Sequence, residues 1–264
     1  ARRLAGDRKA RFAAAAAREA IADAGPTLFA RSSPYDRALS FGPGEDPDCL
    51  RGTAEGTTTQ APFDLACAWA AGRLGFQGPR VVNIGACAAG AMAIGEGFRL
   101  VRAGRVPLAL VGGHDAIPSP VGVMGFSILG ALSGRHDQAA AASRPFDVSR
   151  DGFVPGEGAG MLVIEALDHA LARGARIHGE LVGYGASCDA YKPTAPEPDG
   201  RGAILALRRA LADAGWEPER VGYVNAHGTS TPLNDLTETK ALKAALGAHA
   251  HRIPVSSTKS QIGH

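Results

Sequence analysis

Segments with the pattern of buried strands alternate with segments that favour helices along most of the 264-residue chain, and this alternation restricts the possible folds more than any other feature. The expected strands are rich in apolar and β-branched residues and cover 37–42, 79–84, 106–113, 160–165, 177–186 and 220–226. The expected helices cover 11–24, 61–74, 88–102, 200–214 and 234–246. Alternation of this kind predicts a layered α/β protein.

Two of the expected helices end in similar sequences. ArgGluAlaIleAlaAspAlaGly at 18–25 and ArgArgAlaLeuAlaAspAlaGly at 208–215 are identical at six of eight positions, and each precedes a strand and a glycine-containing loop. Alanine-rich helices also match by chance, so an internal duplication and a coincidence both remain open at this point.

Charge and cysteine content narrow the function classes. The formal net charge is +2, which argues against a surface that is basic overall, and no nucleic-acid-binding motif is found. The four cysteines form no CxxC pair and have no zinc-like spacing, which favours a reduced, cytoplasmic setting without a metal site. Arg18 and Glu19 interrupt the apolar run 13–17, and we expect neither a signal peptide nor a membrane span.

Cys87 is the candidate nucleophile. It lies in AsnIleGlyAlaCysAlaAlaGly, between an expected buried strand and an expected helix. A thiol at a helix N-terminus is close to the positive end of the helix dipole, which stabilises the thiolate. The alternative is a small structural cysteine that fills space.

Two histidines follow expected strands, where loops would present them to a pocket. His227 lies in AsnAlaHisGlyThrSerThrPro, and His264 ends ValSerSerThrLysSerGlnIleGlyHis. Together with a thiolate, two histidines could bind a thioester carbonyl and stabilise an enolate. The other histidines have no such setting, and we interpret them as structural or solvated.

Three charged residues close to these histidines allow two interpretations. Lys259 precedes His264 by five residues, while Asp235 and Glu238 follow His227 at the start of an expected helix. They could be surface charges and first-turn acids, which favour helix N-termini. A lysine paired with a carboxylate could instead set the protonation state of the histidines.

Four segments around these residues resemble the motif series of β-ketoacyl-acyl-carrier-protein synthases, members of the thiolase superfamily. The segments cover 86–95, 143–160, 225–235 and 256–264. Their order and spacing agree with the elongating, type II-like subgroup, with His227 lying 140 residues after Cys87 and His264 a further 37 residues on.

The resemblance implies an α/β fold of the thiolase type, with two similar halves stacked as α-β-α-β-α layers. Residues 1–170 would form the half that carries the nucleophile, and 171–264 the half that carries both histidines. The chain resembles a fragment that begins after the start of the family pattern and stops before its last helix and glycine-rich loop. We therefore expect an incomplete second half that is inactive by itself.

The resemblance also implies a role for individual residues. Cys87 matches the acyl-accepting nucleophile, His227 and His264 the decarboxylation histidines, Lys259 the lysine that supports them, and Glu238 the carboxylate partner of that lysine. Thr229 and Thr231 match hydroxyls that contact the phosphopantetheine arm, Phe126 matches a residue of the acyl pocket, and Arg51 is a candidate basic contact to the carrier. One departure is Gly85, where many relatives have threonine.

The implied activity is that of a 3-oxoacyl-carrier-protein synthase, an acyltransferase that elongates fatty acid or polyketide chains. Its partners would be acyl- and malonyl-loaded acyl carrier protein and a second copy of the chain in a homodimer. No metal or organic cofactor is expected, because the carrier brings the phosphopantetheine. The alternatives are a polyketide ketosynthase, a non-catalytic chain-length partner of the same fold, and a cysteine hydrolase.

Overall fold

The computed structural model describes residues 7–44, 63–192 and 194–264, which form two compact units. The first unit comprises Ala1–Gly122 and Glu157–Leu181, and the second comprises Val123–Gly156 and Val182–His264. The division into similar halves at residues 170 and 171 stays a prediction.

A four-stranded mixed sheet forms the centre of the first unit, with the strand order β2-β1-β3-β4. Its strands are β1 (Arg37–Pro43), β2 (Arg80–Val82), β3 (Leu108–Ala116) and β4 (Glu157–Glu165). β1 pairs in parallel with β2 and β3, whereas β4 runs antiparallel to β3. All of β1 and the first five residues of β3 are buried, as expected for strands covered on both faces.

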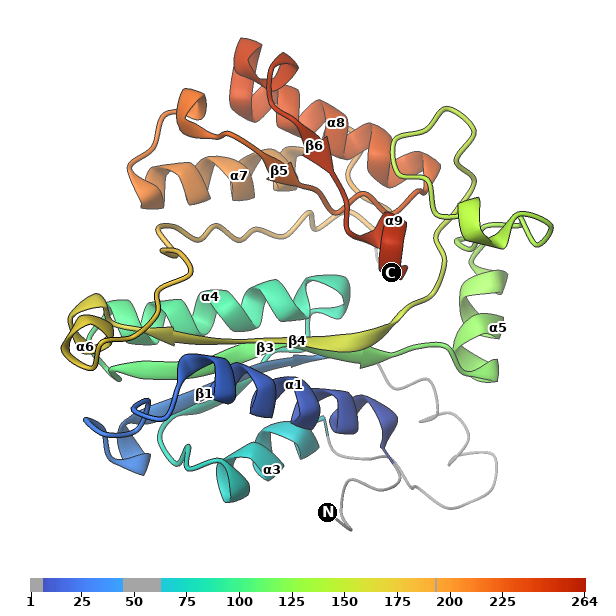
Figure 1. Ribbon diagram of the computed structural model, residues 1–264. Coiled ribbons are helices and arrows are strands. Elements are labelled where there is room, and N and C mark those ends of the chain that lie inside the picture. The colour runs from blue at the N-terminus through green and yellow to red at the C-terminus, as the bar shows by residue number, and fades with distance from the viewer. Residues whose placement is uncertain (1–6, 45–62, 193) are drawn as a thin grey trace. The chain divides into compact units, whose positions relative to one another are not determined.

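Helices cover both faces of this sheet. α1 (Arg8–Ala24) and α3 (Leu65–Arg73) lie against one face and α4 (Ala89–Arg102) against the other (Figure 1). α1 begins where the Asp7 carboxylate accepts the Ala10 N–H at 2.9 Å, and it ends at Gly25 with φ 89°, a conformation suited to glycine. The short α6 (Leu167–Ala172) follows β4.

The first unit has a distinct core on each face of the sheet. On the α1 side, a face of α1 made of alanine packs with larger side chains, among them Leu39, Phe41 and Phe76. On the α4 side the core includes Ala38, Ala109 and Val111. Because small residues meet the sheet, both helices can approach it closely.

The second unit has a two-stranded parallel sheet packed with helices. Its strands are β5 (Val224–Asn225) and β6 (Val255–Ser256), and its helices are α7 (Arg201–Ala214), α8 (Pro232–Leu246) and α9 (Lys259–Ile262), together with most of α5 (Pro120–Ile128). Leu242, Leu246 and Ile253 form its core with partly buried residues that include Leu207 of α7. Thr231 caps α8 by accepting the Asn234 N–H at 3.3 Å.

The described part of the chain also contains five short 3₁₀ helices that were not expected from the sequence. They are η2 (Pro34–Asp36), η3 (Ala86–Ala88), η4 (Ala139–Ala141), η5 (Pro218–Arg220) and η6 (Gly247–His251).

Most of the elements expected from the sequence are confirmed, within a few residues at their ends. The strand expected at 177–186 is wrong, since these residues contain no strand. In the part of this segment that belongs to the second unit, the Tyr184 N–H donates to the Asp213 carboxylate of α7 at 3.0 Å instead of to a neighbouring strand. A Cβ on Gly183 would lie 2.4 Å from the Ala210 carbonyl oxygen, so the segment runs directly against α7. The apolar pattern here marks packing on a helix.

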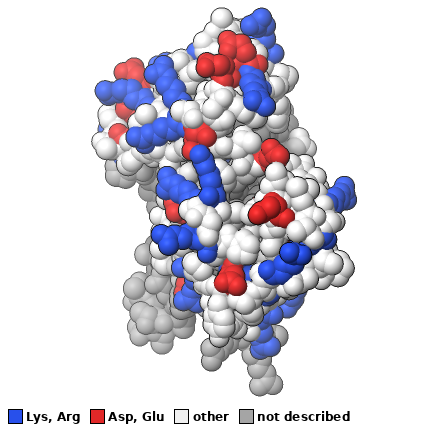
Figure 2. Space-filling view, turned by 90° about the vertical axis from the view of Figure 1, so that its left-hand side faces the viewer, with Lys and Arg blue, Asp and Glu red and all other residues white. Residues whose placement is uncertain are grey.

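Charged side chains of both signs lie on the surface (Figure 2). On the face drawn in Figure 2, Lys and Arg side chains are interspersed with Asp and Glu, consistent with a formal net charge of +2. Among the described residues, no helix combines the length and apolar character needed to cross a membrane.

Candidate active-site residues

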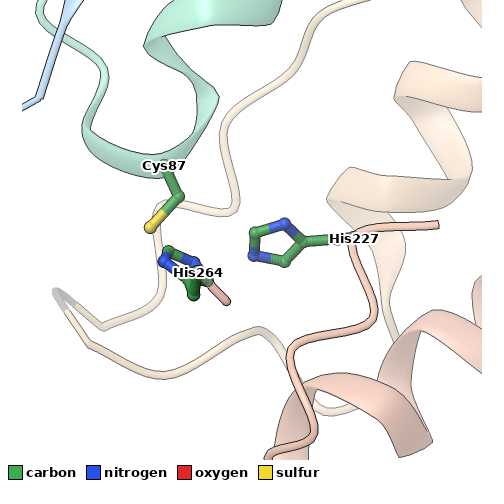
Figure 3. Close-up of side chains that lie close together, drawn as sticks. All are labelled: Cys87, His227 and His264. Atoms are coloured by element: carbon green, nitrogen blue, oxygen red, sulfur yellow. The ribbon is translucent and has the colours of Figure 1, made fainter. Parts of the chain in front are cut away.

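Cys87 lies in a tight turn that joins the sheet of the first unit to α4. After β2, Asn83 is held to β1 by its N–H, which donates to the Phe41 carbonyl at 2.9 Å, and by its side-chain amide, which donates to Ser40 Oγ at 3.1 Å. The turn closes where Ala88 N–H donates to the Gly85 carbonyl at 3.0 Å. Cys87 thus belongs to η3, directly before α4 (Figure 3).

The backbone beside Cys87 is strained. Ala86 has φ 47°, a left-handed conformation that is unfavourable for a residue with a side chain. Such strain persists only where the surroundings hold it, and it is common where a side chain must be presented for chemistry. Strand, strained turn and helix together present the Cys87 thiol, which is exposed, at the N-terminal end of a 14-residue helix.

A second cysteine of the same unit shows the opposite environment. Cys67 on α3 is 1% exposed, and burial raises the pKa of its thiol to about 12. A thiol with so high a pKa is a poor nucleophile near neutral pH. The contrast favours Cys87 as the reactive cysteine of this unit.

The second unit brings His227 and His264 together, as the sequence predicted for a histidine pair. Their ring centroids are 5.3 Å apart and their ring planes meet at 76° (Figure 3). His227 follows β5, and its carbonyl accepts a hydrogen bond from Ser257 Oγ at 3.1 Å. His264 follows α9, and its N–H donates to the Val154 carbonyl at 2.7 Å. Both histidines are therefore fixed through their backbones.

Both imidazoles are neutral at pH 7. Burial lowers the pKa of His227 to about 3, and the positive charge of Lys259 and the neighbouring His264 lower this pKa further. Burial, followed by the charge of Lys259, lowers the pKa of His264 to about 4. A neutral imidazole carries one N–H donor and one acceptor, so each ring can donate a hydrogen bond to an oxyanion without being an acid itself.

Lys259 occupies the first position of α9 and is half-buried. Ser143 Oγ donates to the Lys259 carbonyl at 2.7 Å, which joins the 143–150 segment to this residue. After burial, which is the larger cause, its charge lowers the pKa of both histidines, and a lysine–carboxylate pair that sets their protonation state stays a prediction.

Glu238 holds the backbone of the His227 loop. Its two carboxylate oxygens accept the N–H groups of His227 at 2.7 Å and of Gly228 at 2.8 Å, and Asn234 Nδ2 donates to it at 3.3 Å. Sequence reasoning assigned Glu238 to Lys259 and missed these amide contacts. The pairing with Lys259 stays a prediction.

Thr229 and Thr231 lie together on the same loop, with their hydroxyl oxygens 2.9 Å apart. Thr229 is buried, and Thr231 also serves as the N-cap of α8. Their hydroxyls thus have local structural roles, and contact with a phosphopantetheine arm stays a prediction.

Phe126 belongs to a row of three rings. Its ring lies edge-on to Phe153, with centroids 5.3 Å apart, and Phe153 in turn lies 4.8 Å from the His264 ring. Sequence reasoning missed Phe153, although it lies within the 143–160 motif. Whether Phe126 contacts an acyl chain stays a prediction. Arg51 lies outside the described residues.

Solved structures show the class of fold to which these units belong. The chain matches a complex of a type II polyketide synthase acyl-carrier protein with its ketosynthase, at a TM-score of 0.89 and 34% identity, covering 99% of this chain and 69% of that one. It also matches a β-ketoacyl synthase from Burkholderia phymatum, at a TM-score of 0.84 and 34% identity, covering 97% of this chain and 65% of that one. The fold is thiolase-like, of the ketosynthase kind.

Comparisons of sequence lead to the family. The model of the β-ketoacyl synthase N-terminal domain matches residues 2–170, and that of the C-terminal domain matches residues 178–264. The chain belongs to the β-ketoacyl synthase family.

Its curated relatives include 3-oxoacyl-[acyl-carrier-protein] synthase 2 from Synechocystis sp., 55% identical over 201 residues, and the protein of the same name from Staphylococcus aureus, 49% identical over 201 residues. These alignments cover 76% of this chain and 48% and 50% of the two relatives, so the chain spans about half the length of the curated relatives it matches.

Proposed function

We propose that the protein is a 3-oxoacyl-carrier-protein synthase that extends acyl chains by decarboxylative Claisen condensation. In the first stage, the Cys87 thiolate attacks the thioester carbonyl of an acyl-loaded carrier protein. The carbon-sulfur bond to the carrier breaks, the carrier leaves as a thiolate, and the acyl group remains on Cys87. The exposed thiol on a strained turn before α4 supports this role.

In the second stage, a malonyl-loaded carrier loses CO₂, and the electron pair of the broken carbon-carbon bond forms an enolate. His227 and His264 donate hydrogen bonds to the enolate oxygen. The enolate carbon then attacks the acyl carbonyl, and the tetrahedral intermediate expels the Cys87 thiolate to leave a β-ketoacyl carrier. The proposed reaction needs no metal or organic cofactor.

The observation that carries this proposal is the pair of neutral imidazoles, with centroids 5.3 Å apart and pKa values lowered to about 3 and about 4. A hydrolase needs a histidine that accepts a proton near neutral pH. Two histidines that resist protonation are better suited to donate hydrogen bonds to an oxyanion. The pair therefore favours condensation over hydrolysis.

The test is to follow both stages in an enzyme as long as its curated relatives, with acyl- and malonyl-loaded carrier protein and mass spectrometry as the readout. Cys87→Ala should abolish acyl-enzyme formation, whereas Cys188→Ala, which removes an exposed cysteine of the other unit, should not. His264→Ala should retain the acyl-enzyme and lose β-ketoacyl product. Acylation that persists in Cys87→Ala at an unchanged rate would contradict the proposal, and release of free acid without extension would indicate a hydrolase.

A polyketide ketosynthase is the second candidate, because one solved neighbour is a polyketide ketosynthase at 34% identity. The curated relatives at 49–55% identity are named 3-oxoacyl-[acyl-carrier-protein] synthase 2, which favours elongation of fatty acids. Rates with carrier proteins loaded with saturated acyl chains or with poly-β-keto chains distinguish the two. We further propose a cytoplasmic homodimer that takes its substrates from an acidic carrier protein.

A further inference from the structure

A residue of the helix that follows Cys87 packs against the turn that presents it. Met92 is a half-buried residue of α4. A Cβ placed on Gly85 would lie 2.3 Å from Met92 Sδ, 3.5 Å from Met92 Cε, and no closer than 3.6 Å to the next atom, Ala89 N. The thioether of Met92 therefore occupies the space that a side chain at position 85 would need.

Gly85 is part of the turn itself. Its carbonyl accepts the Ala88 N–H at 3.0 Å, and the strained Ala86 and then Cys87 follow directly. Both Met92 atoms belong to the flexible end of its side chain, so an added Cβ is accommodated either by a rotation of Met92 or by a displacement of Gly85, and a displacement would change the conformation of Ala86 or move Cys87 relative to the start of α4. Because strained residues keep their conformation only when their surroundings hold them, what packs on Gly85 affects the position of the thiol.

We propose that Met92 is a positioning residue for Cys87 and that residues 85 and 92 form an interlocked pair, in which a side chain at one position excludes a long side chain at the other. The inference rests on the proposed function in taking Cys87 as the acyl acceptor. Met suits this place because its unbranched thioether fills irregular gaps. The thioether at residue 92 thus fills the space that the absence of a side chain at residue 85 leaves open.

The experiment is a double-mutant cycle at residues 85 and 92 in the full chain. The readout is the rate constant for alkylation of Cys87 by iodoacetamide as a function of pH, with the modified residue identified by mass spectrometry. This rate reports the thiolate fraction, which depends on the position of the sulfur at the helix N-terminus. A residue that only stabilises the fold would not shift the pH midpoint of alkylation.

Gly85→Ala should slow alkylation about two- to fivefold near neutral pH and raise the pH midpoint, because the thiol moves away from the helix dipole. Gly85→Ala combined with Met92→Ala should restore the rate to within about twofold of Met92→Ala alone, since the space is then available. Met124→Ala, at an exposed methionine of α5, is the matched control and should not rescue Gly85→Ala.

An equal slowing by Gly85→Ala with and without the Met92→Ala substitution would overturn the proposal, as would no slowing at all. If Gly85→Ala unfolds the chain, the melting temperature replaces the alkylation rate as the readout. A Gly85→Ala, Met92→Ala double mutant that is folded then supports the interlocked pair, and one that is equally unfolded overturns the proposal. Alkylation of Cys87 requires no condensation. In an enzyme as long as its curated relatives, a coupled pair without β-ketoacyl product would therefore contradict the proposed function and leave this inference standing.

Discussion

The buried carboxylate of Asp235 accepts the backbone N–H of Phe146 at 2.7 Å. Phe146 has φ 66°, which is unfavourable for a residue with a side chain, and Arg150 Nε lies 3.5 Å from the same carboxylate. The contact fastens the 143–150 segment to the helix that carries Glu238. One acidic side chain of the first turn of α8 thereby maintains a strained residue far away in sequence.

We predict that Asp235→Ala lowers the free energy of unfolding by about 1–3 kcal/mol, because the Phe146 N–H loses its acceptor in a buried place and Arg150 loses its ion-pair partner. Urea denaturation measures the loss. Asp137→Ala removes an exposed carboxylate and should change stability by less than about 0.5 kcal/mol. Similar losses in the two variants would show that the Asp235 contact is not special.

The histidine pair predicts how stability depends on pH. The pKa of each ring falls from 6.5 to about 3 or about 4 on folding, so between these values the unfolded chain binds more protons than the folded one. The free energy of unfolding therefore has its full value with respect to these histidines above about pH 6.5. As the pH falls below this value it decreases, by at most about 1.4 kcal/mol per pH unit for each histidine.

His264→Gln should therefore reduce the dependence of stability on pH in this range. The measurement is urea denaturation of both proteins at several pH values between about 4 and 7, where the difference between them isolates the histidine from the carboxylates. Parallel curves for the two proteins would mean that His264 has its ordinary pKa in the folded state.

Glu238→Gln tests the contact between this carboxylate and the His227 loop. The amide keeps the shape but offers one oxygen in place of two, so one of the N–H groups of His227 and Gly228 loses its acceptor. We expect decarboxylation of malonyl carrier protein to fall about ten- to a hundredfold through misplacement of His227, with acylation of Cys87 nearly unchanged. An equal loss in both steps would indicate a general disturbance of the fold.

Gly42→Ala tests the contact between β1 and the first turn of α4. The added Cβ would lie 2.2 Å from the Ala89 carbonyl carbon and oxygen, and a backbone group cannot rotate away. We predict a loss of about 1–3 kcal/mol in unfolding free energy together with slower alkylation of Cys87. Gly72→Ala in α3, where nothing lies within 4 Å, should instead stabilise by about 0.5–1 kcal/mol. Loss of stability in both variants would contradict the assignment of the Gly42 effect to this contact.

Features of the fold that depend on residues close together in the sequence could be predicted, and features that depend on distant partners could not. The end of α1 at Gly25 and the strand β1 depend on capping and apolar runs that can be read directly. The strand expected at 177–186 failed because a strand needs a neighbour to pair with, and a run of apolar and glycine residues does not say whether its neighbour is a strand or a helix.

The candidate site shows the same division. The meeting of His227 and His264 was anticipated, although His264 follows the short helix α9 and not, as the sequence had predicted, a strand. That Glu238 accepts backbone N–H groups, and that Phe153 lies against His264, depends on side-chain directions that no spacing encodes. Sequence reasoning assigned a role to Glu238 and none to Phe153, and only the packing revealed what both residues contact.

The face that α1 turns toward the sheet contains Ala10, Ala13, Ala14 and Ala17, each at most 6% exposed. Only Ala→Gly could make these side chains smaller, at a cost of about 1 kcal/mol in helix propensity, so the more harmful substitutions on this face are those that add atoms. For Phe41 and Leu39 in the same core, the more harmful substitutions are those that remove atoms. The substitutions that this face of α1 accepts are thus limited to residues about as small as alanine. In a library of variants sorted by side-chain volume, we expect the buried positions of α1 to reject larger residues and those of β1 to reject smaller ones.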